Sequence, residues 1–244
     1  MNDHIVKSYD HDLTVLDRRI AEMGGLCESL LADAFGALER RDPKKAAAAV
    51  ASDGAIDALD RAIQEWAVLM IARRQPMAND LRHVMTVIKI AGDLERIGDL
   101  AKNIAKRALA VAHETAPKPL MTGLGHMVDH ALGQLKDVLD AYATRDAEKA
   151  MAVWRDDARI DALYNSIFRE MLTYMMEDPR NITLCTHLLF SAKNIERIGD
   201  HTTNIAENVY YLVHGAVPGG SRPKGEDTST LVVMPRDVLK PKHV

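Results

Sequence analysis

The chain repeats itself after about one hundred residues, and this repeat limits the possible folds more than any other feature. Residues 92–109 and 193–210, which lie 101 positions apart, share Glu, Arg, Ile, Gly, Asp, Asn, Ile and Ala. Upstream the spacing becomes 104, because "DGAIDAL" begins at residue 53 and "DARIDAL" at residue 157. Self-similarity of this kind indicates two copies of one structural unit, with a small length difference in an intervening loop.

Each unit is predicted to form three helices. In the first unit, the first helix runs from about Leu13 to Arg40. The second begins at Pro43 with Asp42 as its N-terminal cap, and it ends before Pro76, which disfavours helix at the preceding residue. The third carries apolar residues at helical spacing: Leu94, Ile97, Ala101, Ile104 and Ala108.

The second unit repeats this order, with helices expected near 120–143, 147–177 and 180–213. Apolar residues make up 47% of the chain but aromatic residues only 5%, a balance that favours helix over sheet. The predicted fold class is therefore all-α, a tandem repeat of two three-helix bundles with six long helices. The expected boundaries are 1–112 for the first bundle, 113–214 for the second and 215–244 for a C-terminal tail.

The tail is rich in Gly, Pro, Ser and charged residues. It has too little apolar surface to offset the entropy lost on ordering, about 1–2 kcal/mol per residue. We therefore expect it to be disordered and dispensable for folding, with at most a short strand at "VVM" 232–234.

Four pairs of acidic residues spaced four apart are the candidate functional residues. On a helix, such like-charged pairs cost roughly 0.2–0.5 kcal/mol each, and each unit contains two of them. The pairs lie away from the apolar stripes, and antiparallel neighbouring helices would bring two acidic rows together along a groove. Carboxylates in such a groove repel unless cations lie between them, and all-oxygen sites suit hard divalent or trivalent ions such as Mg, Mn, Ca or Fe. The candidate metal ligands are Asp53, Asp57, Glu95, Asp99, Asp157, Asp161, Glu196 and Asp200.

An alternative is that these pairs are solvated helix surfaces, since Arg96 or Lys102 could neutralise the first row locally. The sequence contains no phosphate-binding glycine loop, no G-x-S-x-G and no Glu-x-x-His motif. We therefore predict no catalytic residue and no organic cofactor. The two cysteines, Cys27 and Cys185, are isolated and are expected to be core residues in a reducing compartment.

Charge and hydropathy argue against three further classes of protein. The net charge is −4 and no basic stripe is interleaved with aromatic residues, so nucleic acid is not an expected partner. The N-terminal stretch "MNDHIVKSYDHDL" is polar and does not resemble a signal peptide. The longest apolar run, "WAVLMIA", is too short to span a bilayer. We expect a soluble cytoplasmic protein.

Four stretches together resemble the PhoU family of bacterial phosphate-signalling and phosphate-transport accessory proteins: "ARRQPMANDLR", "LERIGDLAKNIA", "YMMEDPRNI" and "NIERIGDHTTNIAENVYYL". The resemblance covers about residues 10–214. It implies two similar three-helix bundles whose E(D)xxxD motifs bind metal clusters, and these motifs fall on the eight carboxylates named above. Lys106 stands where the second unit has Glu207, and we expect this lysine to weaken cation binding in the first unit.

The resemblance also implies a regulator rather than an enzyme. Its expected partners are a sensor histidine kinase of the phosphate regulon and the ATPase subunit of the phosphate ABC transporter, through which alone it would reach the membrane. It would hold phosphate-starvation signalling off and restrain uptake, as an adapter and as a homodimer. Two alternatives remain open from the residues alone, a metal-dependent hydrolase or oxidase and a metal-buffering protein.

Overall fold

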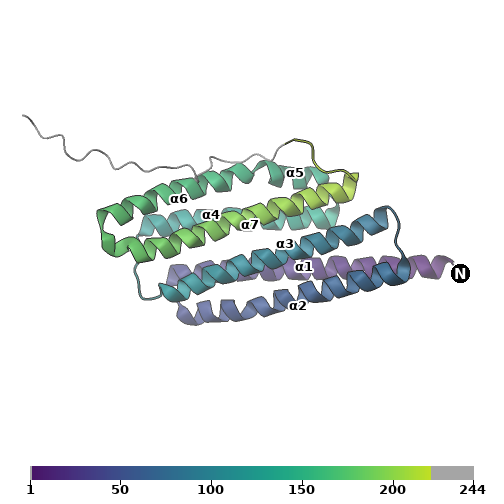
Figure 1. Ribbon diagram of the computed structural model, residues 1–244, viewed down its shortest axis with the longest axis horizontal. Helices are drawn as coiled ribbons and strands as arrows, with labels where there is room; N and C mark the ends of the chain where they lie inside the picture. Colours follow the sequence, from purple (N-terminus) through teal and green to yellow (C-terminus); the bar gives the residue numbers. More distant parts are fainter. Residues whose placement is uncertain (1, 221–244) are drawn as a thin grey trace, which may run out of the picture.

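The computed structural model describes residues 2–220, which fold into long helices arranged in two layers (Figure 1). The prediction of an all-α tandem repeat is confirmed, and no strand occurs between residues 2 and 220. The expectations for residues 221–244, including the strand at 232–234, lie outside the described residues. The elements are α1 (Asn2–Arg40), α2 (Pro43–Arg74), α3 (Asn79–Ala110), α4 (Lys118–Thr144), α5 (Ala147–Arg155), α6 (Asp157–Glu177), the 3-10 turn η1 (Pro179–Asn181) and α7 (Ile182–His214).

The helix starts and ends follow the local signals in the sequence. Asp42 caps α2, because its Oδ1 accepts hydrogen bonds from the backbone N–H groups of Lys44 and Lys45 at 2.9 and 3.0 Å. Asp146 caps α5 in the same way, accepting from the backbone N–H of Lys149 at 2.9 Å. The α2 helix ends at Arg74, and the capping residue Gln75 that follows has a φ of 50°, in the left-handed region just before Pro76.

Two boundaries differ from the predictions. The helix expected over 147–177 is broken at Asp156, whose backbone N–H lies 3.2 Å from the Ala152 carbonyl and 3.1 Å from the Val153 carbonyl. This shared bond tightens one turn and separates α5 from α6, although the sequence has neither Gly nor Pro there. The α1 helix begins at Asn2 rather than near Leu13, because the polar residues before Leu13 include no helix breaker.

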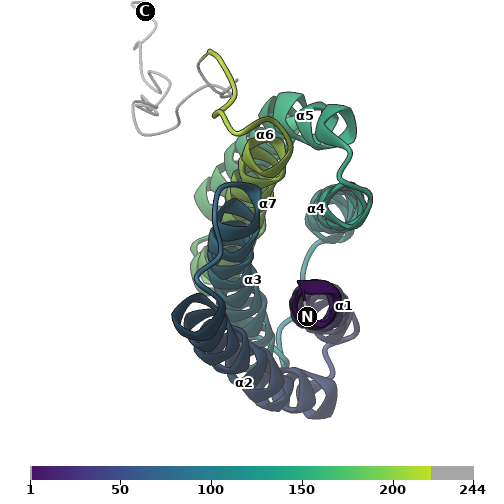
Figure 2. The ribbon, with the colours of Figure 1, turned by 90° about the vertical axis from the view of Figure 1, so that its right-hand side faces the viewer.

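The two bundles form one two-layered body. Viewed end-on, α2, α3, α7 and the α5–α6 pair follow one another along an arc, while α1 and α4 lie on its inner side (Figure 2). The α3 and α7 helices, one from each repeat, run side by side at the centre of the arc, and α1 contacts α4 behind them. The third helices of both repeats therefore meet at the middle of the molecule. None of the described helices is long and apolar enough to cross a membrane.

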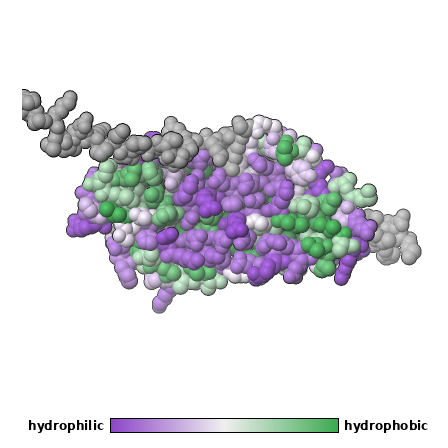
Figure 3. Space-filling model, viewed as in Figure 1, coloured by the Kyte–Doolittle hydropathy of each residue, from purple (hydrophilic) through white to green (hydrophobic). Residues whose placement is uncertain are grey.

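The outer face of the layer formed by α2, α3, α7 and the α5–α6 pair is hydrophilic along its middle, with hydrophobic patches toward both ends (Figure 3). Exposed apolar side chains gather near the α2–α3 junction and near the α6–α7 junction, which lie at opposite ends of the layer. They include Met77, Leu81 and Met85 at one end, and Met176, Ile182 and Phe190 at the other.

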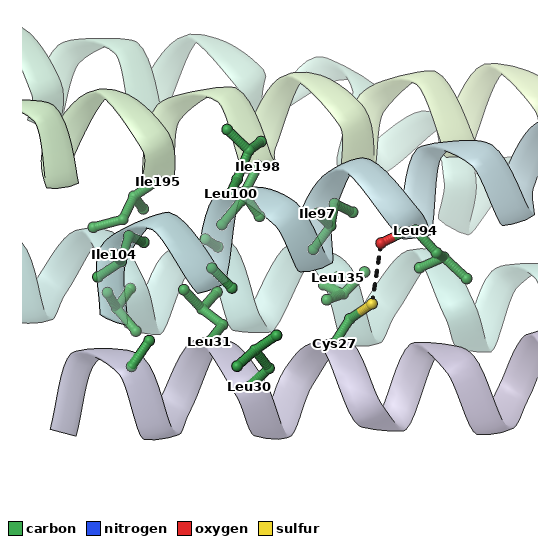
Figure 4. Packing of buried hydrophobic residues seen from close by; sticks show 14 of the residues in the cluster. Cys27, Leu30, Leu31, Leu94, Ile97, Leu100, Ile104, Leu135, Ile195 and Ile198 are labelled. Carbon is green, nitrogen blue, oxygen red and sulfur yellow. Dashed lines mark hydrogen bonds between the residues drawn. The ribbon is translucent and has the colours of Figure 1, made fainter. Parts of the chain in front are cut away.

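A continuous apolar core joins the two repeats. Ile97 and Leu100 of α3 and Ile195 and Ile198 of α7 belong to this core together with side chains of α1 and α4 (Figure 4). The thiol of Cys27 is fully buried and lies 3.2 Å from the Leu94 carbonyl oxygen, and burial raises its pKa. Both cysteines are buried and free, as predicted.

A polar cluster also links the repeats. Asp17 of α1 accepts hydrogen bonds at Oδ1 from Tyr142, and its Oδ1 lies 2.8 Å from His83 Nε2. Arg145, just after α4, reaches Asp17 Oδ2 at 3.0 Å. Burial opposes ionisation of Asp17, but these bonds and the Arg145 charge outweigh it, so its pKa is lowered.

Candidate functional site

A glycine in each repeat allows the second and third helices to approach closely. A Cβ atom on Gly98 would lie 3.0 Å from Ile56 Cδ1, and one on Gly199 would lie 3.0 Å from Ile160 Cγ2. This approach buries the first carboxylate of each acidic row, so Asp53 is only 4% exposed and Asp157 only 2%. The helical spacing placed both residues away from the apolar stripe, so the sequence did not predict their burial.

In the first repeat, Lys102 joins two of the predicted ligands. Its Nζ lies 2.5 Å from Asp53 Oδ2 on α2 and 2.5 Å from Asp99 Oδ1 on α3. Burial works against the charged amine, but the bonds to Asp53 and Asp99 prevail and raise the pKa of Lys102. The lysine therefore stays charged between the two carboxylates.

The rest of the first row lies beside this bridge. Arg96 Nε is 3.4 Å from Glu95 Oε2, and Arg96 Nη1 is 3.6 Å from Asp99 Oδ2. The pKa of Glu95 is raised, first by burial and then by the charge of Asp99, with smaller contributions from Asp60 and Asp57, while Arg96 opposes the rise. The structure therefore brings the acidic rows of α2 and α3 together, as predicted.

The second repeat has a matching arrangement with different partners. Thr203 Oγ1 donates to Asp157 Oδ1 at 2.9 Å, and Lys193 Nζ lies 2.8 Å from Glu196 Oε1. Burial raises the pKa of Glu196, Lys193 opposes this, and the charges of Asp200 and Asp161 raise it further. Asp161, Glu196 and Asp200 therefore influence one another across the α6–α7 contact.

Three buried carboxylate oxygens at these rows have no hydrogen-bond partner: Asp53 Oδ1, Asp60 Oδ1 and Glu196 Oε2. Such orphaned acceptors are unfavourable without a donor or a cation. Between residues 2 and 220, however, no three Asp, Glu, His or Cys side chains converge closely enough to enclose an ion. The oxygen donors suit a hard cation in chemistry, but side chains would have to turn toward it.

The sequence identified the eight carboxylates but not all of the residues that control them. Lys102 and Arg96 were the two residues that the sequence offered to neutralise the first acidic row. Lys102 aligns with Thr203 in the 101-residue repeat, and this difference between the two copies is the sequence feature that distinguishes it. Lys106, expected to influence the first row, is exposed. Its counterpart Glu207 accepts a hydrogen bond from Trp154 Nε1 at 2.9 Å, a contact that no sequence spacing suggested.

Comparisons with known proteins agree with this architecture. The family model "PhoU domain" matches residues 20–108 and 124–209, one match in each repeat. The chain is 57% identical over 228 residues to the "Phosphate-specific transport system accessory protein PhoU homolog" of Rhizobium meliloti (strain 1021), covering 93% of this chain and 96% of that protein.

Two solved structures are similar over most of the chain. The crystal structure of PhoU from Pseudomonas aeruginosa superposes with a TM-score of 0.82 at 38% sequence identity, covering 85% of this chain and all of that one. The crystal structure of the phosphate transport system regulatory protein PhoU from Streptococcus pneumoniae gives a TM-score of 0.80 at 28% identity, covering 86% of this chain and 99% of that one.

Proposed function

The chain belongs to the PhoU family, and we propose that it is a negative regulator of phosphate-starvation signalling and of phosphate uptake. The observation that carries this proposal is the match of both repeats, at 57% identity over nearly the whole chain, to an accessory protein of phosphate-specific transport. Its place is the cytoplasm, beside the phosphate ABC transporter.

The proposed mode of action is that of an adapter rather than an enzyme. It would bind a sensor histidine kinase and the ATPase subunit of the transporter as a homodimer, and stabilise the silent state of the kinase. To shift the kinase from 1:99 to 99:1 in favour of the silent state, the adapter must bind that state about 5.5 kcal/mol more favourably than the active state. The exposed apolar side chains at the two ends of the layer formed by α2, α3, α7 and the α5–α6 pair provide surface from which a helical interface can be built.

Cation binding belongs to this proposal. The oxygen donors at the acidic rows and the orphaned Glu196 Oε2 support a hard divalent or trivalent ion, such as Mg, Mn or Fe. In the second repeat the ion would be held by Asp157, Asp161, Glu196 and Asp200. Four carboxylates around one divalent or trivalent ion would still carry net negative charge, which a basic patch on a partner could recognise.

Deleting the gene tests the regulatory role. We expect phosphate-starvation genes to switch on in phosphate-rich medium, and the wild-type gene to silence them again. A deletion strain that has no second copy of the protein and keeps these genes silent would refute the proposal.

Complementation tests the contribution of the second acidic row. The variant Asp161→Asn/Glu196→Gln/Asp200→Asn is expected to repress less well than wild type. The matched control neutralises three exposed acids elsewhere and should repress fully, since it makes the same change in net charge: Glu65→Gln, Asp129→Asn and Glu177→Gln. Equal repression by the two variants would show that docking does not use the acidic row.

A further inference from the structure

We infer that the cavity at the junction of the two repeats binds a small molecule with one carboxylate and an apolar or aromatic body. The cavity has a volume of about 410 Å³, a size typical of pockets that hold small ligands, and it lies where α1 and α3 end and where α4 and α7 begin. Its apolar walls are Leu38, Val111, Met121, Leu184 and Leu188. None of the eight carboxylates of the acidic rows lines it, so this inference is independent of the proposed function.

The internal repeat indicates which ligand this cavity suits. Four residues that line the cavity occupy the same repeat positions as the four residues of the polar cluster around Asp17. The corresponding pairs, at spacings of 104, 104, 104 and 101, are Leu38 and Tyr142, Arg41 and Arg145, Met121 and Asp17, and Leu184 and His83. These are the spacings by which the two repeats align, so the cavity and the cluster are equivalent places at opposite ends of α3.

The polar cluster shows which groups an arginine contacts at this position. Arg145 Nη2 lies 3.0 Å from Asp17 Oδ2 and 2.7 Å from His83 Nε2. The Cζ atom of Arg145 lies 4.7 Å from the centre of the Tyr142 ring. A carboxylate and an aromatic ring, both favourable partners of a guanidinium, therefore contact it together.

Arg41 has the same backbone conformation as Arg145, with a φ of 54° against 57°, but it has different partners. Among residues 2–220, its side chain donates one hydrogen bond, from Nη1 to Thr115 Oγ1 at 2.8 Å, and forms no ion pair. Met121 and Leu38 stand where the polar cluster has its carboxylate and its ring, and neither can pair with a guanidinium. A ligand with a carboxylate and an aromatic body would supply both contacts.

The other charged residues at the cavity favour a ligand with a single negative charge. Lys118 adds a second cation to Arg41, but Glu39 and Glu114 also line the cavity, so the four charges cancel. An anion is therefore held by direct contact with Arg41 rather than by the overall field of the cavity. The two acids would repel a multiply charged ion such as phosphate more strongly than a monocarboxylate.

An NMR titration of the full-length protein, with its leucine methyl groups labelled, tests the site without any substitution. The probe is 4-hydroxyphenylacetate, which combines the carboxylate and the phenol ring that Asp17 and Tyr142 present to Arg145. We expect saturable shifts at Leu184 and Leu188 with a Kd of about 1 mM or lower, and no binding of the neutral 4-hydroxyphenylacetamide or of inorganic phosphate at the same concentrations. The inference is overturned by equal binding of the amide or of phosphate, by the largest shifts occurring away from the cavity, or by no saturable binding at about ten times that concentration.

Three variants then test the role assigned to Arg41, with the fold checked by circular dichroism. Arg41→Gln should weaken binding of 4-hydroxyphenylacetate about tenfold or more, whereas the matched control Arg40→Gln, at an exposed neighbour that does not line the cavity, should leave the Kd unchanged. Glutamine suits the backbone at residue 41, because Gln75 adopts a φ of 50° at the end of α2. Met121→Asp introduces the carboxylate that the polar cluster has at this repeat position, so it should pair with Arg41 and prevent binding of the probe. Wild-type affinity in Arg41→Gln or in Met121→Asp would overturn the inference.

Discussion

Replacing Lys102 by Met removes the ammonium from two carboxylates while keeping the length of the apolar stem. Asp53, with a side chain only 6% exposed, would then hold a negative charge without its cation, and its other oxygen already has no partner. Breaking a fully buried ion pair from one side costs about 3–5 kcal/mol. Lys102 is one-fifth exposed and Asp99 one-third, so water reaches part of the site, and we expect a loss of about 2–3 kcal/mol.

The assay is urea unfolding followed by circular dichroism, with a chelator present so that no trace metal replaces the ammonium. The matched control is Lys106→Met on the same helix, where the lysine is exposed and a change within about 0.5 kcal/mol is expected. In thermal unfolding, a loss of about 2–3 kcal/mol corresponds to a fall in Tm of roughly 4–12 °C for a chain of this size.

A double-mutant cycle isolates the pair. Asp53→Asn/Lys102→Met removes both charges, so its loss should be smaller than the sum of the single losses by about 1–3 kcal/mol. The folded protein raises the pKa of Lys102 above 10.5, so the stabilisation is fully present below pH 10.5 and disappears only as the pH rises through the folded value. A Lys102→Met protein as stable as wild type at pH 7, or additive losses in the cycle, would refute this reasoning.

Three further changes probe other parts of the molecule. Asp17→Asn should lower the free energy of unfolding by about 1–2 kcal/mol at pH 7. Because folding lowers the pKa of Asp17, the difference from wild type should begin to shrink near pH 3.8 and vanish only once the pH has fallen through the lower folded pKa; a difference that does not shrink with falling pH would contradict the role of its charge. Glu196→Ala/Asp200→Ala should lose bound metal in elemental analysis and keep its far-ultraviolet circular dichroism, whereas unchanged metal content would count against the second acidic row as a site. Gly199→Val should lower the free energy of unfolding in urea by about 1–3 kcal/mol, since the new Cβ would lie 3.0 Å from Ile160. Unchanged stability would show that the contact between α6 and α7 does not depend on this glycine.

Much of the fold could be predicted because its signals are local. The signals used act within one or two helical turns: the caps at Asp42 and Asp146, the prolines and the spacing of apolar residues. The internal repeat gives most of these signals twice, once in each copy. The break at Asp156 could not be predicted, because it depends on one shared hydrogen bond rather than on a breaker residue. The closeness of the two bundles, with α3 against α7, likewise has no short-range signature in the sequence.

The candidate site was predictable as far as helical geometry reaches. Residue spacing predicted the acidic rows and the helices that carry them. The raised pKa values of Glu95 and Glu196, to which acidic residues of the neighbouring helix contribute, agree with that prediction. To predict the burial of Asp53, one would have to know that Gly98 lets α2 pack closely against α3, which is a tertiary contact. The choice of Lys102 over Lys106 as the cation of the first row depends on the reach of a flexible side chain, which spacing alone leaves open.

The difference between the repeats has a thermodynamic consequence if the second repeat binds the exchangeable ion. A tethered ammonium stabilises the first bundle at every ion concentration, whereas an ion that binds only the folded second bundle stabilises it by an amount that grows with concentration, about 2.7 kcal/mol at one hundred times its Kd. Sensitivity to ions is then confined to α6 and α7. Because α7 packs along α3 at the centre of the molecule, stabilisation of α7 by an ion would also bear on the contact between the two repeats.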